Sequence, residues 1–281
     1  MRKKMISMAA IAAMILTVFA PVPAVAKEKA NKPLVKSVKH QLYDTSKKKW
    51  MTTSVTTYKY KKGYPTKIKR VDYEDGKKDG GYYVGTMKYK FKKGKPKSMK
   101  ETVKKCYPGG KPDTYKYSRK YNKKGLLVKE YNSDRNTTTT YQYNKHGIVT
   151  SFQMSGPQSG GWRDSHVYKV KQKKGLPTKI IYPGDGERCV YTFNKIGAAT
   201  KITSKSRYEG STTTIKYKTK KGKVLSVTKL YSGYEDFGDT VETHKYKSRV
   251  IISYGKTKTT KKRYAQMINS VVGVDCYNLW Y

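Results

Sequence analysis

Residues 141–152 read YQYNKHGIVTSF, and this pattern decides the fold. Two aromatic residues flank a polar one, a polar turn ends in Gly147, and the hydrophobic Phe152 follows five residues later. The unit recurs seven times, although the copy around Gly125 lacks a hydrophobic residue at the fifth position. Repeats at this spacing indicate one supersecondary unit that cannot bury its apolar face alone. The turn glycines are Gly63, Gly94, Gly125, Gly147, Gly175, Gly197 and Gly222.

The residues before each glycine alternate strictly between apolar and basic. In Met87-Lys88-Tyr89-Lys90-Phe91-Lys92, for example, every second side chain is apolar and the others are lysines. A period of two is typical of a strand with one buried face and one solvent-exposed face. Glycine supplies the positive φ that a tight hairpin needs. The pattern therefore predicts an all-β chain of about sixteen strands, an antiparallel hairpin-repeat meander that forms an extended twisted or rolled sheet.

Segments at both ends depart from the repeat. A first hairpin, 34–43 and 50–60, lacks the glycine turn, and we expect residues 27–57 to cap the repeat domain of 58–255. An eighth hairpin around 243–254 is degenerate. In the remainder, 256–281, Tyr264, Met267, Ile268 and Val271 have helical spacing and Gly273 follows, which predicts a short C-terminal helix. We expect this helix to cover the apolar face of the sheet, with a membrane-surface helix as the alternative.

The first 26 residues predict export. Arg2, Lys3 and Lys4 precede a mostly apolar stretch, and Ala24-Val25-Ala26 forms a small-x-small cleavage site. No other apolar run is long enough for a transmembrane helix. We therefore expect a secreted or cell-envelope protein, cleaved near Ala26. A composition poor in aliphatic residues with a formal charge of +43 would suggest disorder, but the period of the strands argues against it.

Three units carry a resemblance to a known family. Tyr141-x-Tyr143-Asn144-x-x-Gly147, Tyr121-Asn122-x-x-Gly125 and Phe193-Asn194-x-x-Gly197 resemble the tyrosine–aspartate (YD) repeats of RHS-type surface proteins. The resemblance implies a β-hairpin repeat on an exported bacterial protein. The acidic position of the motif is Asn or Lys here, and seven units are too few for the shell that such proteins build around a cargo. The encapsulation function is therefore not carried over.

The sequence contains no recognisable catalytic, cofactor or metal motif. Cys106, Cys189 and Cys276 lack metal spacing and admit one disulfide or buried thiols. The four histidines are scattered, with His146 in a hairpin turn. Acidic residues gather in loops, which favours solvated turns and leaves a polysaccharide hydrolase with paired carboxylates as an alternative. These residues are Asp72, Glu74, Asp75, Asp79, Asp185, Glu187, Glu235, Asp236 and Asp239. We predict a non-enzymatic protein with no cofactor and no metal.

The strong positive charge is the second sequence feature that suggests a function. Lysines outnumber arginines 53 to 9, and they lie on the wet strand face and in the turns. Such a face attracts polyanions with a strength that falls with salt. Scarce arginine and export make nucleic acid unlikely and favour anionic cell-wall polymers or acidic glycans. Alternatively, the lysines only keep sheet edges from associating. The candidate face consists of Lys59, Lys61, Lys88, Lys90, Lys92, Lys169, Lys171, Lys216 and Lys218.

A further alternative is an outer-membrane barrel. The chain ends in Tyr277-x-Leu279-x-Tyr281, which resembles the alternating last strand of such barrels, and about sixteen strands would suit one. The strands, however, carry mainly Tyr and Thr rather than the aliphatic residues that a lipid-facing surface requires.

Overall fold

The computed structural model describes residues 32–271 except 62, 74–80, 108, 134, 158–162, 175, 184–187, 237–239 and 260. The predicted signal peptide therefore lies outside the described residues. The elements are seventeen strands and one helix, α2 (Lys261–Val271). The strands are β1 (Lys32–Asp44), β2 (Lys49–Lys61), β3 (Tyr64–Asp72), β4 (Tyr82–Lys92), β5 (Lys95–Cys106), β6 (Asp113–Tyr121), β7 (Leu127–Asn132), β8 (Thr137–Tyr143), β9 (Val149–Ser155), β10 (Arg163–Val167), β11 (Lys169–Lys173), β12 (Leu176–Pro183), β13 (Arg188–Phe193), β14 (Ala199–Lys205), β15 (Glu209–Lys220), β16 (Lys223–Asp236) and β17 (Val241–Thr259).

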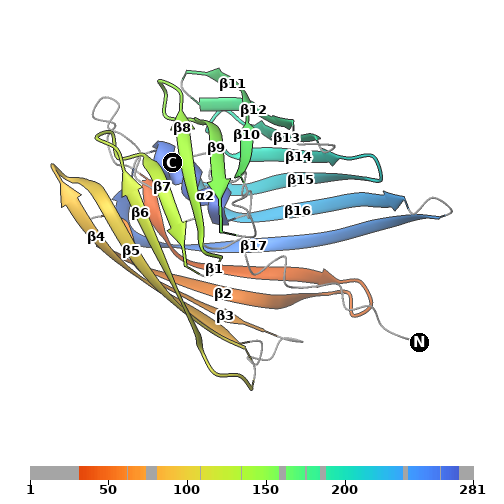
Figure 1. The fold of residues 1–281 in the computed structure, drawn as a ribbon. Helices are drawn as coiled ribbons and strands as arrows, with labels where there is room; N and C mark the ends of the chain where they lie inside the picture. The colour runs from red at the N-terminus through yellow and green to blue at the C-terminus, as the bar shows by residue number, and fades with distance from the viewer. Residues whose placement is uncertain are drawn as a thin grey trace.

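These strands form one antiparallel meander that rolls into a nearly closed barrel (Figure 1). The first strand, β1, pairs with both β2 and the last strand, β17. Strands β10 and β11 are separated only by Tyr168; β10 pairs with β9, whereas β11 pairs with β12. The backbone N–H of Tyr168 donates to the Thr150 carbonyl at 2.8 Å, where the pairing changes sides. The prediction of a rolled all-β meander is confirmed, with β10 and β11 acting as one strand.

The repeat glycines lie together at one end of the barrel, which we call the glycine-turn end. Six of them have positive φ, between 69° and 82°, and Gly175 lies outside the described residues. Four turns are of the Lys-Gly type, and in the two whose residues are both described, Lys93 and Lys221 also have positive φ. Two consecutive residues with positive φ define the type I′ hairpin turn, whose twist matches that of the strands.

Three other turns depend on asparagine at the start of the Asn-x-x-Gly sequence. The side-chain oxygen of Asn144 accepts hydrogen bonds from the backbone N–H groups of His146 and Ile148, both at 3.0 Å. Asn122 and Asn194 make the same pair of bonds. Asparagine at the acidic position of the repeat thus holds the turn through an Asx-type hydrogen bond.

The tyrosines of the repeat also have a specific hydrogen-bonding role. In four places a half-buried tyrosine at the glycine-turn end of a strand donates its hydroxyl to a backbone carbonyl of a neighbouring strand. In three of them the acceptor is the second residue after a turn glycine, so each hairpin is joined to the next. The pairs are Tyr60 to Val35, Tyr143 to Leu127, Tyr217 to Ala199 and Tyr254 to Val224.

The inner face of the barrel forms the hydrophobic core. Five of the six predicted fifth-position residues are buried there, and Ile202 is half-buried. The predicted helix is confirmed as α2, which lies inside the rolled sheet (Figure 1). Its residues Tyr264, Met267 and Ile268 are buried. This burial leaves those apolar side chains unavailable to a membrane surface. The buried fifth-position residues are Ile68, Met99, Phe152, Ile180 and Val227.

Three local predictions differ from the structure. The first hairpin is not a terminal cap, because β1 is paired on both edges. The degenerate hairpin at 243–254 is a continuous part of β17, since 245–252 lack a turn residue. The Gly, Ser and Asp content of 232–238 predicts a loop, but Ser232 to Asp236 continue β16 with unbroken pairing to β17.

Candidate polyanion-binding surface

All nine lysines of the predicted face are exposed. They lie on β2, β4, β11 and β15, in the half of each strand that is nearer to the glycine-turn end when β10 and β11 are counted as one strand. Exposed lysines on intervening strands, Lys67 and Lys69 on β3 and Lys201 on β14, extend the same surface. We call these twelve residues the lysine collar. The alternation of the repeats predicted nine of them, and the same rule applied to the return strands would have found the other three.

Carboxylates occupy the opposite half of the molecule. Among the described residues, every Asp and Glu lies in the loops or in the half of its strand farther from the glycine turns. The connections that lack the repeat glycine, such as those after Asp44 and Asp72, lie at this end, which we call the loop end. The described negative charge is therefore confined to one half of the barrel, whereas exposed lysines occur in both halves. The described carboxylates are Asp44, Asp72, Glu101, Asp113, Glu130, Glu209, Glu235, Asp236 and Glu242.

Two of these carboxylates are engaged inside the barrel. Arg119 donates from Nη1 to Glu101 at 2.8 Å and from Nε to Glu130. Arg119 and Glu101 are both almost fully buried. Burial raises the pKa of Glu101, and the Arg119 charge opposes this shift. Because one guanidinium holds both acids, this cluster is built as an ion-pair network rather than as two carboxylates facing a substrate.

The remaining polar candidates are dispersed. Arg70 pairs with Asp72, whereas Glu74, Asp75, Asp79, Asp185, Glu187 and Asp239 lie outside the described residues. Cys106 and Cys189 carry thiols, and Cys276 is not described. Within the described part of the chain, no three His, Cys, Asp or Glu side chains are grouped so that they could hold a metal ion.

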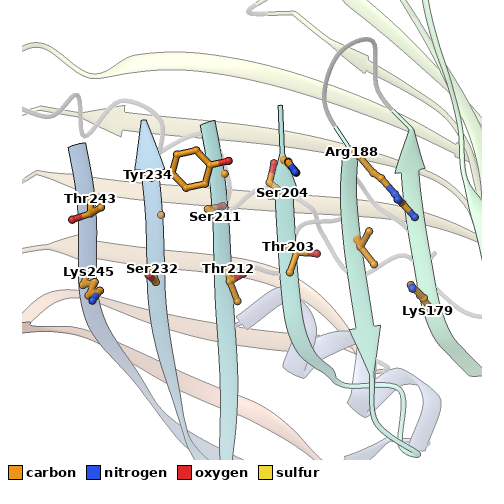
Figure 2. Close-up of a pocket in the computed structure, with 14 residues that line it drawn as sticks. Lys179, Arg188, Thr203, Ser204, Ser211, Thr212, Ser232, Tyr234, Thr243 and Lys245 are labelled. Carbon is orange, nitrogen blue, oxygen red and sulfur yellow. The ribbon is translucent and has the colours of Figure 1, made fainter. Parts of the chain in front are cut away.

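The outer face also contains a shallow groove of about 690 Å³ across β12 to β17, shown in Figure 2. Two cross-strand rows form its floor, as the strand register shows. The row nearer the loop end contains Arg188, Lys205, Gly210, Tyr234 and Thr243. The other row contains Val190, Thr203, Thr212, Ser232 and Lys245. With Lys179, four cations line the groove, and no carboxylate is among its described lining residues.

Tyr234 has an unusual position in this groove. A Cβ atom on Gly210 would lie 2.6 Å from Cε1 of Tyr234, so the ring occupies the space above the glycine. Gly210 is buried, whereas Tyr234 remains 39% exposed. The alternation of the repeats does not extend to this site, because Gly233 interrupts the pattern of β16. Two glycines within alternating strands, Gly210 and Gly233, were the available signal, since glycine inside a strand marks close approach.

Comparisons with known proteins add little to this description. No protein-family model matches the sequence, and no curated protein matches it. Among solved structures, the barrel is similar to a porin-like protein from Bacteroides uniformis, with 9% sequence identity and a TM-score of 0.36. The match covers 80% of this chain and 100% of the other. Such a low TM-score supports no inference about this chain. In the described part of the chain, no helix combines the length and hydrophobicity needed to span a bilayer.

Proposed function

We propose that this chain is an exported, non-enzymatic barrel that binds anionic polymers of the cell envelope, such as wall polymers or acidic glycans, through its lysine collar. The observation that carries the proposal is the separation of the carboxylates from the lysine collar. Exposed lysines occur in both halves of the barrel, but the described carboxylates lie in the loop-end half or inside the barrel, so none of them offsets the collar. If lysines served only to keep the protein dispersed, no such separation would be required.

The separation also gives the bound protein an orientation. A single-sign surface attracts opposite charge over several ångströms, within a Debye length of about 8 Å at physiological salt. The glycine-turn end should therefore approach an anionic surface first, with the loop end pointing away. The helix α2 lies inside this end and supports the strands that carry the collar, since it bonds to the Gly197 and Val224 backbones.

Salt-dependent retention on immobilised heparin tests this proposal. Replacing Lys88, Lys90, Lys216 and Lys218 by glutamine should lower the salt concentration needed for elution. The matched control replaces Lys48, Lys104, Lys111 and Lys116, which are exposed near the loop end. If both variants lower the eluting salt concentration equally, retention depends only on net charge, and the collar is not a specific binding surface.

An outer-membrane barrel is the second candidate, because one observation favours it. The first and last strands pair, so the antiparallel meander closes on itself, as in such barrels. Its exterior differs from theirs, since lysines such as Lys67, Lys88 and Lys216 project outward where an apolar band is required. Each lysine costs about 2–4 kcal/mol at the bilayer midplane. We therefore favour the water-exposed barrel.

Solubility separates these two candidates. The chain without residues 1–26 should remain monodisperse in detergent-free buffer and should migrate identically on gels whether heated or not. Detergent-dependent solubility with heat-modifiable migration would instead support the membrane barrel.

A further inference from the structure

We propose that the groove across β12 to β17 is a discrete binding site for a short acidic saccharide that carries carboxylate groups. This inference deepens the proposed function and rests on it, but it concerns a surface outside the lysine collar. In the proposed complex, Arg188 and Lys205 contact the carboxylate and Tyr234 lies against a sugar ring. The hydroxyls of Thr203, Thr212 and Ser232 contact the sugar hydroxyl groups.

The shape of the groove fits an extended ligand. Its volume of about 690 Å³ lies within the usual range for ligand sites. It crosses six neighbouring strands, and at roughly 4.8 Å between strands its floor is about 24 Å long. A single sulfate or phosphate ion would occupy only a small part of this length. An oligosaccharide laid across the strands would follow the whole floor.

The two rows present different chemistry to the two edges of such a ligand. Residues on the same face of a strand are about 7 Å apart along it, so the rows are separated by this distance. Arg188 and Lys205 are directly paired neighbours in the row nearer the loop end. The hydroxyls of Thr203 and Thr212 are directly paired in the other row. A pair of cations therefore lies in one row beside a run of hydroxyls in the other, while Lys179 and Lys245 lie at the two ends of the hydroxyl side.

The Tyr234 ring supplies the apolar contact. Lys205 pairs with Gly210, and Gly210 pairs with Tyr234, so the ring above Gly210 is next to the cation pair. One face of the ring lies on the Gly210 backbone, which leaves the other face to the groove (Figure 2). Aromatic rings offer a flat, amphipathic surface at a low entropy cost. Any larger residue at position 210 would push the ring out of this position.

Calorimetric titration of the chain without its signal peptide tests this site. The probes are a trimer of galacturonic acid, the neutral trimer of galactose and inorganic sulfate, at constant ionic strength. We expect saturable binding of the acidic trimer, at least tenfold weaker binding of the neutral one, and no saturation by millimolar sulfate. Replacing Arg188 and Lys205 by glutamine should weaken acidic-trimer binding about tenfold or more, because charge-assisted hydrogen bonds are lost.

Matched variants separate the groove from a general effect of charge. Lys104→Gln with Lys116→Gln removes the same charge at two exposed positions outside the groove and the collar, and should change acidic-trimer affinity less than twofold. Tyr234→Phe should retain affinity, whereas Tyr234→Leu, which still covers Gly210, should weaken it at least fivefold. Unfolding by urea establishes that each variant is folded.

The possible failures are distinguishable. The groove site is overturned if the native chain does not bind the acidic trimer, if sulfate binds equally well, or if the two double variants lose affinity equally. In these cases retention on heparin can persist, and the proposed function stands. Loss of specific heparin retention as well would overturn both.

Discussion

Asn269 on α2 accepts a hydrogen bond at Oδ1 from the backbone N–H of Ala199 on β14, at 2.9 Å. Its side-chain nitrogen donates to the Gly197 carbonyl at 2.8 Å. All of these contacts are buried inside the barrel. The helix is thus fixed to the sheet by one side chain that satisfies two backbone groups of a single turn.

Asn269→Ala should therefore lower the free energy of unfolding by about 2–4 kcal/mol, since two buried backbone groups lose their partners. Urea unfolding followed by circular dichroism measures the change. Ser270→Ala, at the half-buried neighbouring position, is the matched control and should cost less than about 1 kcal/mol. Similar losses for both variants would contradict the role of Asn269.

The hydroxyl of Tyr217 should contribute measurably to the free energy of unfolding. Tyr217→Phe keeps the ring and removes only the donor to the Ala199 carbonyl, so we expect a loss of about 1–3 kcal/mol in the free energy of unfolding. Tyr208→Phe is the control, because Tyr208 is 58% exposed. If the two phenylalanine variants are equally stable, the bridge between hairpins contributes nothing.

The sequence predicted those parts of the fold that local patterns determine. Alternation in strands such as β4 separates lysines from apolar residues, and the glycine turns mark where strands reverse. The closure of the sheet was not predictable in this way. It depends on β1 pairing with β17, in which Lys39 faces Ile251, and no local pattern records a partner so distant in sequence.

The candidate site was likewise predictable only where local patterns determine it. Exposure of the nine lysines could be predicted, because the side of a strand follows from its period. The groove could not, since its rows combine one or two residues from each of several strands. Arg188 and Tyr234 become neighbours of the same row only through the register of four strands.

His40 should make stability depend on pH in the acidic range. It lies on β1, and burial together with the charges of Lys229 and Arg70 lowers its pKa from 6.5 to about 3. Below pH 6.5 the His40 side chain is protonated in the unfolded chain but stays neutral in the folded chain. Protonation therefore favours the unfolded state, and the free energy of unfolding falls as the pH falls toward 3.

His40→Gln removes this titration. The stability of the native chain relative to the variant should therefore fall between pH 6.5 and pH 3, by up to about 1 kcal/mol per pH unit. Urea unfolding at pH 7.5, 5.5 and 4.5 measures the difference. A difference that is constant across these values would show that His40 does not titrate in this way.

Arg119 should be the most sensitive charged residue of the interior. It is 2% exposed and neutralises Glu101 and Glu130, so Arg119→Met leaves buried acids without a partner. Breaking a buried pair in this way costs about 3–5 kcal/mol. The triple variant Arg119→Met, Glu101→Gln, Glu130→Gln removes every charge of the network and should recover at least half of that loss. Urea unfolding at pH 7 compares the two. If the triple variant is as unstable as the single one, the cost arises from packing around Arg119 and not from uncompensated charge.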